Sequence, residues 1–415
     1  MRPVFRAVPV ILLLVALAVA LVPRGGHSLP LYAARTGLMC QNCHFDPNGG
    51  GPRNDFGFAY ARNRHALTPE DSTSQWHDLN VTNRVGDQMP LYIGADQRFM
   101  MLLNSQASND SLEQFGFFDM ETDLHFAFQP HRRLTLVYTA DGSFGNYTAF
   151  AGGNFKTREA YGMIGGMPLD GYVRAGRFRV PFGLRWDDHT VATRNSFLDF
   201  YDGRAFLPYD PRATDAGIEA GGDHGNWFGR GSFTNGPASP LGSPPFAETF
   251  ALKLGFNSPR AQVAASFYDN FNHPPPFGGI KRATRWGIYG LSHAGSFAFL
   301  GELAAGTDEA APPAGMASGT KNNLLAGIIE ADYALRRSLN FRARYDRVEL
   351  ARGQPQPLED QGTFDRYAIE GEIVPAPFTE LRWTLRYIDP AADSDRFGQR
   401  LRPDRQAYLQ FHFRY

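Results

Sequence analysis

Apolar and polar residues alternate with a period of two through much of this chain, and this pattern constrains its fold more than any other feature. It is clearest in "DMETDLHFAFQ", residues 119–129. Met120, Thr122, Leu124, Phe126 and Phe128 form one set, and Asp119, Glu121, Asp123 and His125 lie between them. Because successive side chains of a β-strand point to opposite faces, strict alternation predicts a strand with one apolar and one polar face.

The same pattern recurs in three later segments. They are "ETFALKLGF" (248–256), "LRWTLRY" (381–387) and "QAYLQFHFRY" (406–415). No stretch after the N-terminus approaches the eighteen or so consecutive apolar residues of a membrane helix. Charged residues instead recur between many aromatic ones, as is typical of strands that face lipid on one side and water on the other. The apolar-alternating last strand, which ends on Tyr415, resembles the C-terminus of bacterial outer-membrane barrels.

Short and long connections alternate along the chain between these segments. Short, turn-like links occur at 129–133, 166–171, 222–226, 257–260, 292–295, 335–338 and 375–378. Long polar or Pro/Gly-rich connections occur at about 104–116, 140–155, 181–213, 234–248, 269–283, 305–321, 351–364 and 388–405. Outer-membrane barrels have short periplasmic turns and longer outer loops. The sequence therefore predicts an all-β, transmembrane outer-membrane β-barrel of about 16 antiparallel strands that starts near Pro90. The alternative is a large soluble all-β protein.

The N-terminus has the pattern of a secretory signal. Arg2 and Arg6 precede an apolar run from Val8 to Val22, which is short for a membrane span. An N-terminal anchor helix is the alternative. We therefore expect three parts: a signal peptide at 1–27, a small segment at 28–88 and the barrel at 89–415. The expected location is the bacterial outer membrane.

The motif "CQNCH" contains the only two cysteines of the 415-residue chain, Cys40 and Cys43, followed by His44. This C-x-x-C-H spacing is the pattern of covalent c-type haem attachment. Two thiols add to the two vinyl groups of one haem, and the adjacent imidazole becomes the proximal iron ligand. A disulfide or a redox-active C-x-x-C is the alternative in an exported protein. The sequence predicts one haem c.

The flanks of this motif carry a resemblance to a known family. "PLYAARTGLMCQNCH" (30–44) resembles the haem-binding N-terminus of the fused outer-membrane monohaem c-type cytochrome–porins, in which an aromatic residue, Ala and a Thr-Gly pair precede the motif. Tyr32, Ala33, Thr36 and Gly37 match these positions, and Phe56 and Gly57 match a Phe-Gly pair that follows. Ala34 and Arg35 stand where the family has Arg and Gln. The spacer "FDPNGGGPRN" looks closer to single-haem porins of extracellular electron transfer.

The resemblance implies electron transfer across the outer membrane through one haem, with extracellular Fe(II), or another redox donor or acceptor, and a periplasmic c-type cytochrome as partners. It also implies an iron:cytochrome c reductase type of activity. A porin or channel with a haem-bearing plug is one alternative. The barrel component of a multi-cytochrome conduit is another.

The segment 28–88 is too small to bury a haem by itself. We therefore expect it to form a plug inside or beneath the barrel lumen, toward the periplasm. His65 is the first candidate for the distal haem ligand, because residues 55–67 favour a short helix that folds back over the haem. Met89 and His77 are the next candidates, Met39 lies too close to the motif, and an open, water-bound site is the remaining alternative.

Charges gather on the expected inward faces of several strands, although the formal net charge is only −1 and gives no basic signal for nucleic acid. The acidic set is Asp119, Glu121 and Asp123, and the basic set is Arg342, Arg344, Arg366, Arg382, Arg386 and Arg414. They predict either a hydrated pore lined by mixed charge or arginines that hold the haem propionates or acidic plug residues.

The longest connection, 179–206, contains Asp187, Asp188 and His189 in succession. Carboxylate and imidazole groups can hold Fe(II) transiently, so these three residues are a candidate metal site. The alternative is a loop that folds inward and forms salt bridges at a pore constriction.

Overall fold

The computed structural model of the protein describes most of the chain from residue 30 onward. The described residues are 30–104, 114–142, 156–186, 191, 193, 214–236, 249–270, 280–310, 321–349, 360–361, 363–390, 395–396, 399–400 and 403–415. Within this part of the chain, no helix has the length and apolar character needed to cross a membrane.

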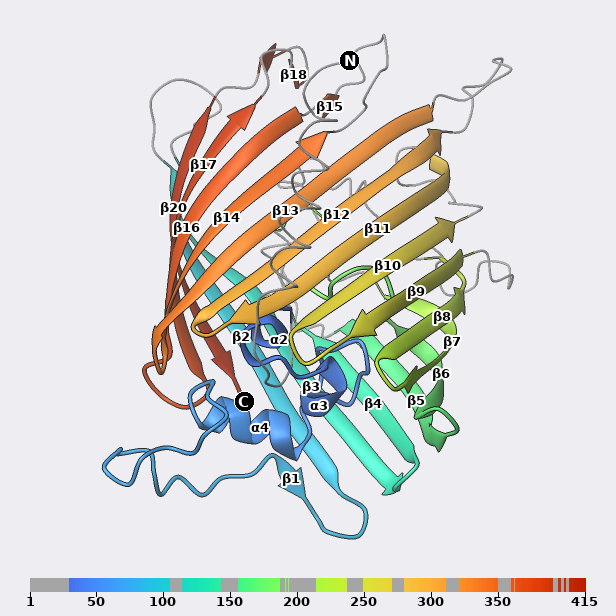
Figure 1. The fold of residues 1–415 in the computed structure, drawn as a ribbon, viewed down its shortest axis with the longest axis vertical. Helices are drawn as coiled ribbons and strands as arrows, with labels where there is room; N and C mark the ends of the chain where they lie inside the picture. Colours follow the sequence, from blue (N-terminus) through green and yellow to red (C-terminus); the bar gives the residue numbers. More distant parts are fainter. Residues whose placement is uncertain are drawn as a thin grey trace.

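Sixteen antiparallel strands form a closed barrel, as predicted (Figure 1). They are β2 (Leu91–Asn104), β3 (Gln114–His131), β4 (Leu134–Asp141), β5 (Lys156–Met167), β6 (Gly171–Phe178), β7 (Asp215–His224), β8 (Trp227–Thr234), β9 (Thr249–Asn257), β10 (Ala261–Asn270), β11 (Ile280–Ala294), β12 (Phe297–Ala310), β13 (Lys321–Arg336), β14 (Leu339–Glu349), β16 (Thr363–Ile373), β17 (Thr379–Pro390) and β20 (Asp404–Arg414). Each strand pairs with its neighbours in sequence, and β20 pairs with β2 to close the ring.

Four shorter strands lie outside this ring. β1 (Arg84–Val85) pairs with the start of β2. β15 (Asp360–Gln361), β18 (Asp395–Arg396) and β19 (Gln399–Arg400) form a separate small sheet.

The seven short links all join consecutive strands at one end of the barrel. Several contain a residue in the left-handed backbone conformation that a tight turn requires, such as Gly225 and Gly295 with φ near +60°. At the predicted position 335–338, β13 turns into β14 through Arg337 and Ser338 alone. The short connections predicted from the sequence are therefore the turns between consecutive strands at one end of the barrel.

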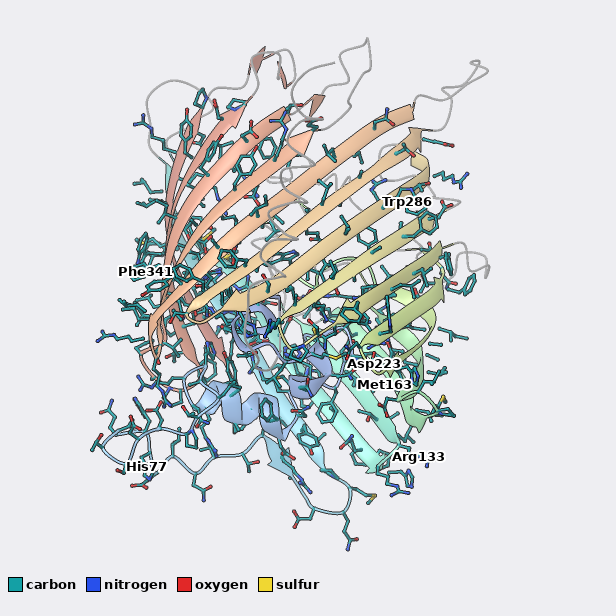
Figure 2. All side chains as sticks on the ribbon, in the orientation of Figure 1. His77, Arg133, Met163, Asp223, Trp286 and Phe341 are labelled. Atoms are coloured by element: carbon teal, nitrogen blue, oxygen red, sulfur yellow. The ribbon has the colours of Figure 1, made fainter. Side chains whose placement is uncertain are left out.

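The alternation within each strand separates an outer apolar face from an inner polar face. On β17 the side chain of Leu385 is 57% exposed, whereas that of its neighbour Arg386 is buried. Trp286 and Phe341 lie on the outer face of the wall (Figure 2). Of the predicted inward acidic set, Glu121 and Asp123 are buried. The side chain of Asp119 lies outside the described part, and the pairing of β2 with β3 shifts register just before it, between Arg98 and Phe99.

The N-terminal segment contributes three short helices: α2 (Pro30–Thr36), α3 (Cys40–Cys43) and α4 (Asp55–Arg62). α2 packs against β11 and β12, and Leu31 and Ala34 join a buried apolar cluster with Leu184 and Trp186 (Figure 1). α4 lies at the end with the short links, where Phe58 packs on Phe378 and Tyr415. That this segment is a haem-bearing plug stays a prediction.

The lipid-facing assignment of β17 predicts a large penalty for a charge at Leu385, the seventh of its twelve residues. Leu385→Arg should lower the free energy of unfolding from lipid vesicles by about 2–4 kcal/mol, because a strand centre faces the bilayer midplane. The control is Leu169→Arg in the β5–β6 link, where the leucine is 61% exposed. We expect a change of about 0.5 kcal/mol or less there. Equal effects in a chemical-denaturant titration would contradict the lipid-facing assignment.

Candidate functional site

The candidate haem-attachment residues share a single helical turn. α3 runs from Cys40 to Cys43, and the backbone N–H of His44 donates to the Cys40 carbonyl at 3.0 Å to end it. Residues three and four apart lie on one face of a helix, so both cysteines and His44 are brought together. Cys43 and His44 are buried, the two thiols are not joined as a disulfide, and burial raises the pKa of the Cys40 thiol.

Three consecutive glycines fold the chain back under this turn. Gly49, Gly50 and Gly51 all have positive φ, at 93°, 73° and 65°. A Cβ at Gly50 would lie 2.5–2.7 Å from the Arg185 guanidinium, so any larger residue would displace this side chain and would also be strained at the positive φ. The reversal pairs His44 with Arg53 and brings the Gly51 carbonyl within 3.3 Å of His44 Nδ1. A metal-binding histidine commonly donates its second ring N–H to such a carbonyl, which orients the ring.

α4 crosses directly over α3. The Asn54 side chain caps α4 by accepting from the Gly57 N–H at 3.0 Å. A Cβ at Gly57 would lie 2.2 Å from the carbonyl oxygen of Cys43, so the two helices can touch only at glycine. The Phe56-Gly57 pair of the sequence therefore has a packing role at the cysteine turn.

Asp46 fixes the cysteine turn to the barrel wall. Its carboxylate accepts from Arg185 at 2.7 Å, lies 2.9 Å from Arg174 of β6 and also accepts from the Asn48 backbone N–H. Burial alone would raise the pKa of Asp46, but the two guanidinium groups lower it below its usual value. Arg185 also forms an ion pair with Glu159 of β5, at 3.2 Å. Two buried arginines thus hold an acidic residue of the N-terminal segment, but they come from β6 and the connection after it and not from the basic set predicted on the last strands.

α2 is held on the other side of the lumen by a second set of polar contacts. Arg35 pairs with Asp332 of β13 and, at 2.6 Å, with Glu372 of β16. The Tyr32 hydroxyl donates to Glu380 of β17 at 2.9 Å. Both sides of the N-terminal segment therefore contact inward-facing charges of the barrel.

Most of the other lumen charges pair with neighbouring strands. Arg344 meets Glu330, Arg366 meets Asp346, and Arg98 meets Glu121. The predicted basic set on the last strands thus pairs mainly with carboxylates of the wall. This arrangement corresponds to the mixed-charge interpretation of the lumen.

Two pockets, both partly open to solvent, lie beside the cysteine turn. The first has an empty volume of about 500 Å³ and is lined by Met39, Cys40, Leu184, Lys253, Tyr289 and His293, among others. The second has about 430 Å³ and is lined by His44, Asp96, His125, His412 and several arginines. Arg185 lines both. The donor set therefore suits haem: two thiols and an oriented imidazole lie on one turn, with arginine side chains nearby.

His65, the predicted distal ligand, lines neither of these two cavities. Its ring lies between Tyr32 and Tyr60, with centroid distances of 4.6 and 5.6 Å. Ligand atoms of His65, Glu372 and Glu380 lie within 4.8 Å of one another. Arginines already neutralise both carboxylates, so this group makes a poor cation site. Burial lowers the pKa of His65 to about 3.

None of His77, Met89 and Met39 lines the cavity that contains His44. His77 is on the segment below the barrel, where its Nδ1 lies 3.0 Å from the Glu70 carbonyl (Figure 2). Met89 is exposed just before β2. Met39 lines the cavity beside Cys40.

The described part of the long connection after β6 folds into the lumen. Glu302 of β12 accepts from the Leu184 N–H, the Trp186 indole and the Thr193 hydroxyl at 2.7–3.0 Å. Phe182 and Val191 are fully buried. Asp187, Asp188 and His189 lie outside the described residues, so the candidate Fe(II) site stays a prediction.

Comparison with known proteins shows which solved structures share this fold. No protein-family model matches the chain, and no curated protein matches it. Three solved structures are similar: the anion-selective porin from Comamonas acidovorans (10% identity, TM-score 0.56, covering 79% of this chain and 100% of that one), the outer membrane channel DcaP of Acinetobacter baumannii (10%, 0.57, 81% and 100%) and Pseudomonas putida OprB (8%, 0.56, 78% and 94%). The chain has the fold of an outer-membrane porin.

This porin-like barrel belongs in the bacterial outer membrane, as the sequence predicted. Sequence reasoning missed Asp46, the glycines at 49–51 and the histidines of the barrel wall. The run "FDPNGGGPRN" was a usable signal for the first two, because three adjacent glycines indicate a special backbone conformation.

Replacing the carboxylate of Asp46 should loosen the N-terminal segment. Asp46→Asn keeps an acceptor for the Asn48 N–H but removes one carboxylate partner from Arg174, which keeps Glu219, and from Arg185, which keeps Glu159. Losing these charge-assisted hydrogen bonds should cost about 1.5–3 kcal/mol. We expect faster hydrogen exchange at the backbone amides of Phe45 and Gly49. Asp78→Asn, at a fully exposed carboxylate, is the control and should change nothing. Equal protection in both variants would refute the role of Asp46.

The packing around His65 should weaken in mild acid. Its pKa of about 3 in the folded state lies below the ordinary value of 6.5, so the unfolded state binds more protons and stability falls as the pH drops below 6.5. Glu372, Glu380, Arg53 and Arg414 face the ring, and between pH 6.5 and about 4.5 the carboxylates remain charged.

Hydrogen exchange at the His65 amide, which donates to the Tyr60 carbonyl, reports this change. His65→Asn should abolish the pH dependence, because Asn tolerates the left-handed backbone at this position (φ 58°). His77→Asn should keep it. A flat profile in the unmodified protein would contradict the neutral state of the partly buried His65 ring.

Proposed function

We propose that this barrel carries one covalently attached c-type haem and moves single electrons across the outer membrane. The observation that supports the proposal is the C-x-x-C-H turn inside a porin-like barrel, with the His44 ring oriented by the Gly51 carbonyl. Cys40 and Cys43 would hold the group through thioethers, and His44 would be its proximal ligand. When bound, the haem supplies an iron that accepts and releases one electron.

The residues around the turn would bind the cofactor and keep it from water. Arg53, Arg98 and Arg414 line the cavity beside His44. They already pair with the wall carboxylates Asp96, Glu121 and Glu380, so a propionate would share these guanidinium groups with the wall. The inward-folded residues 179–186 cover the cavity beside Cys40. The apolar band of an outer-membrane barrel is only about 25 Å tall, so one redox centre within it lies near both mouths.

The resemblance of residues 30–44 to cytochrome–porins suggests the donor and acceptor. An extracellular Fe²⁺ that loses one electron becomes Fe³⁺, and an oxidised periplasmic c-type cytochrome takes up that electron. No proton or covalent bond is exchanged in this step. In this proposal, the apolar outer face of the barrel contacts membrane lipid.

The test is the visible spectrum of the purified protein, produced in a host that attaches haem c. We expect a sharp reduced c-type band that appears promptly on mixing with Fe²⁺ at near-neutral pH. A band that appears only with a strong reductant would keep the cytochrome and exclude Fe²⁺ as donor. Cys40→Ser with Cys43→Ser is the control and should show no band. The absence of a band in the unmodified protein would overturn the proposal.

A diffusion channel is the second candidate, favoured by the similarity to solved porin and channel structures. Single-channel conductance in planar bilayers separates the two functions. The electron-transfer proposal predicts little ion flow, because ion pairs and the N-terminal segment occupy the described lumen. Steady porin-sized conductance in the haem-loaded protein would favour the channel.

A further inference from the structure

The pocket beside Cys40 carries basic side chains and no carboxylate. Its basic lining residues are Arg185, Lys253, Arg260 and His293. No aspartate or glutamate lies among its lining residues, all of which belong to the described part of the chain. The pocket beside His44 instead includes the carboxylates of Asp96, Glu121, Asp123 and Glu159. The positive charge at the Cys40 pocket is therefore not balanced by the groups that line it.

Lys253 has no acidic partner in this pocket. It points inward from β9 and is only 6% exposed. Its register partners are Arg230 on β8 and Ser266 on β10, neither of which is acidic. Its ammonium group donates to the Gly183 carbonyl at 3.3 Å, and no ion pair joins it to a carboxylate of the described residues. A buried ion is costly unless an opposite charge lies beside it, so Lys253 favours an anionic ligand in the pocket.

The Tyr289 hydroxyl is a second group without a partner. Tyr289 of β11 lines the same pocket and is 5% exposed. No described residue donates to its hydroxyl or accepts from it. Glu302 of β12 lies directly opposite in the strand register, but its carboxylate accepts instead from the connection that follows β6. A buried tyrosine hydroxyl usually has a hydrogen-bond partner, so this donor is available to a ligand.

Apolar side chains form much of the remaining pocket wall. Ala33, Leu184 and Leu291 line it and belong to the same buried cluster as Tyr289. The pocket is partly open to solvent, and its lining includes Arg260, an exposed residue of the link between β9 and β10. An anion can therefore enter from the end of the barrel that carries the short links, and the apolar part of such a ligand would lie against these side chains.

We propose that the pocket beside Cys40 binds a carboxylate joined to an apolar body, and that Lys253 and Tyr289 hold its oxygens. One ammonium and one neutral hydroxyl match a single negative charge, since Arg185 already pairs with Asp46 and Glu159. Two sources provide this chemistry: a propionate of an attached haem, or a free organic acid that enters at the short-link end. The inference goes beyond the proposed function, because the site consists of side chains of this chain and does not require haem.

The test is a benzoate titration of the full chain, purified in detergent from a host that does not attach haem c. Isothermal titration calorimetry should show binding of benzoate and about tenfold weaker binding, or none, of benzyl alcohol, which has the same ring without the charge. Lys253→Met and Tyr289→Phe should each weaken benzoate binding about tenfold, as expected for the loss of one charge-assisted hydrogen bond. Arg133→Met and Tyr367→Phe, at exposed positions outside the pocket, are the controls and should leave binding unchanged.

The same titration of the haem-loaded protein identifies the source of the carboxylate. If a propionate occupies the pocket, benzoate should bind only to the haem-free chain, and Lys253→Met should change the reduction potential of the loaded protein. If a free acid is the ligand, benzoate should bind both forms.

Tyr289→Phe removes one oxygen atom and leaves the ring in place, which guards against misfolding as the cause of a lost site. No benzoate binding to the haem-free chain would overturn the inference. Equal binding of benzyl alcohol, or unchanged binding in the Lys253 and Tyr289 variants, would overturn it as well. Absence of haem from protein made in a host that attaches it would instead refute the proposed function and leave the benzoate result unaffected.

Discussion

Backbone hydrogen bonding across the β2–β20 pair closes the ring of sixteen strands, and the rest of the structure depends on this closure. A membrane interior offers no water to pair with N–H and C=O groups, so a spanning sheet is stable only when it has no free edge. Closure then divides the side chains into an outward apolar set and an inward polar set. The inward set supplies at least one partner of most of the charged contacts described above.

The inward charges are compensated in pairs, and the N-terminal segment takes part in this pairing. A buried ion is costly unless a partner of opposite charge lies beside it. Asp46 finds two such partners on one wall, and Arg35 finds two on the other. Any arrangement that separates these pairs leaves an uncompensated buried charge, which is strongly destabilising. We therefore attribute the position of the cysteine turn to charge matching and to the glycines that allow close approach.

The sequence was sufficient for those features that depend on local periodicity. Alternation on β3 and β17 and the seven short links predicted the strand count, the fold and the inward face of residues such as Glu121 and Arg386. It was insufficient for contacts between strands far apart in the chain. Alternation assigns a residue to a face but does not say which residue lies across the lumen, so the meeting of His125 and His412 at Asp96 was not predicted. The register shift beside Asp119 is likewise invisible to a strict period of two.

The two anchor points of the N-terminal segment lie almost diametrically opposite each other. Around the ring, β6, which carries Arg174, and β16, which carries Glu372, are separated by nine strand steps in one direction and seven in the other. The ten residues between Arg35 and Asp46 therefore cross the lumen and connect two facing parts of the barrel wall. Such a connection resists flattening of the barrel into an ellipse. The shape of the cross-section therefore depends on the N-terminal segment in the lumen as well as on the number of strands.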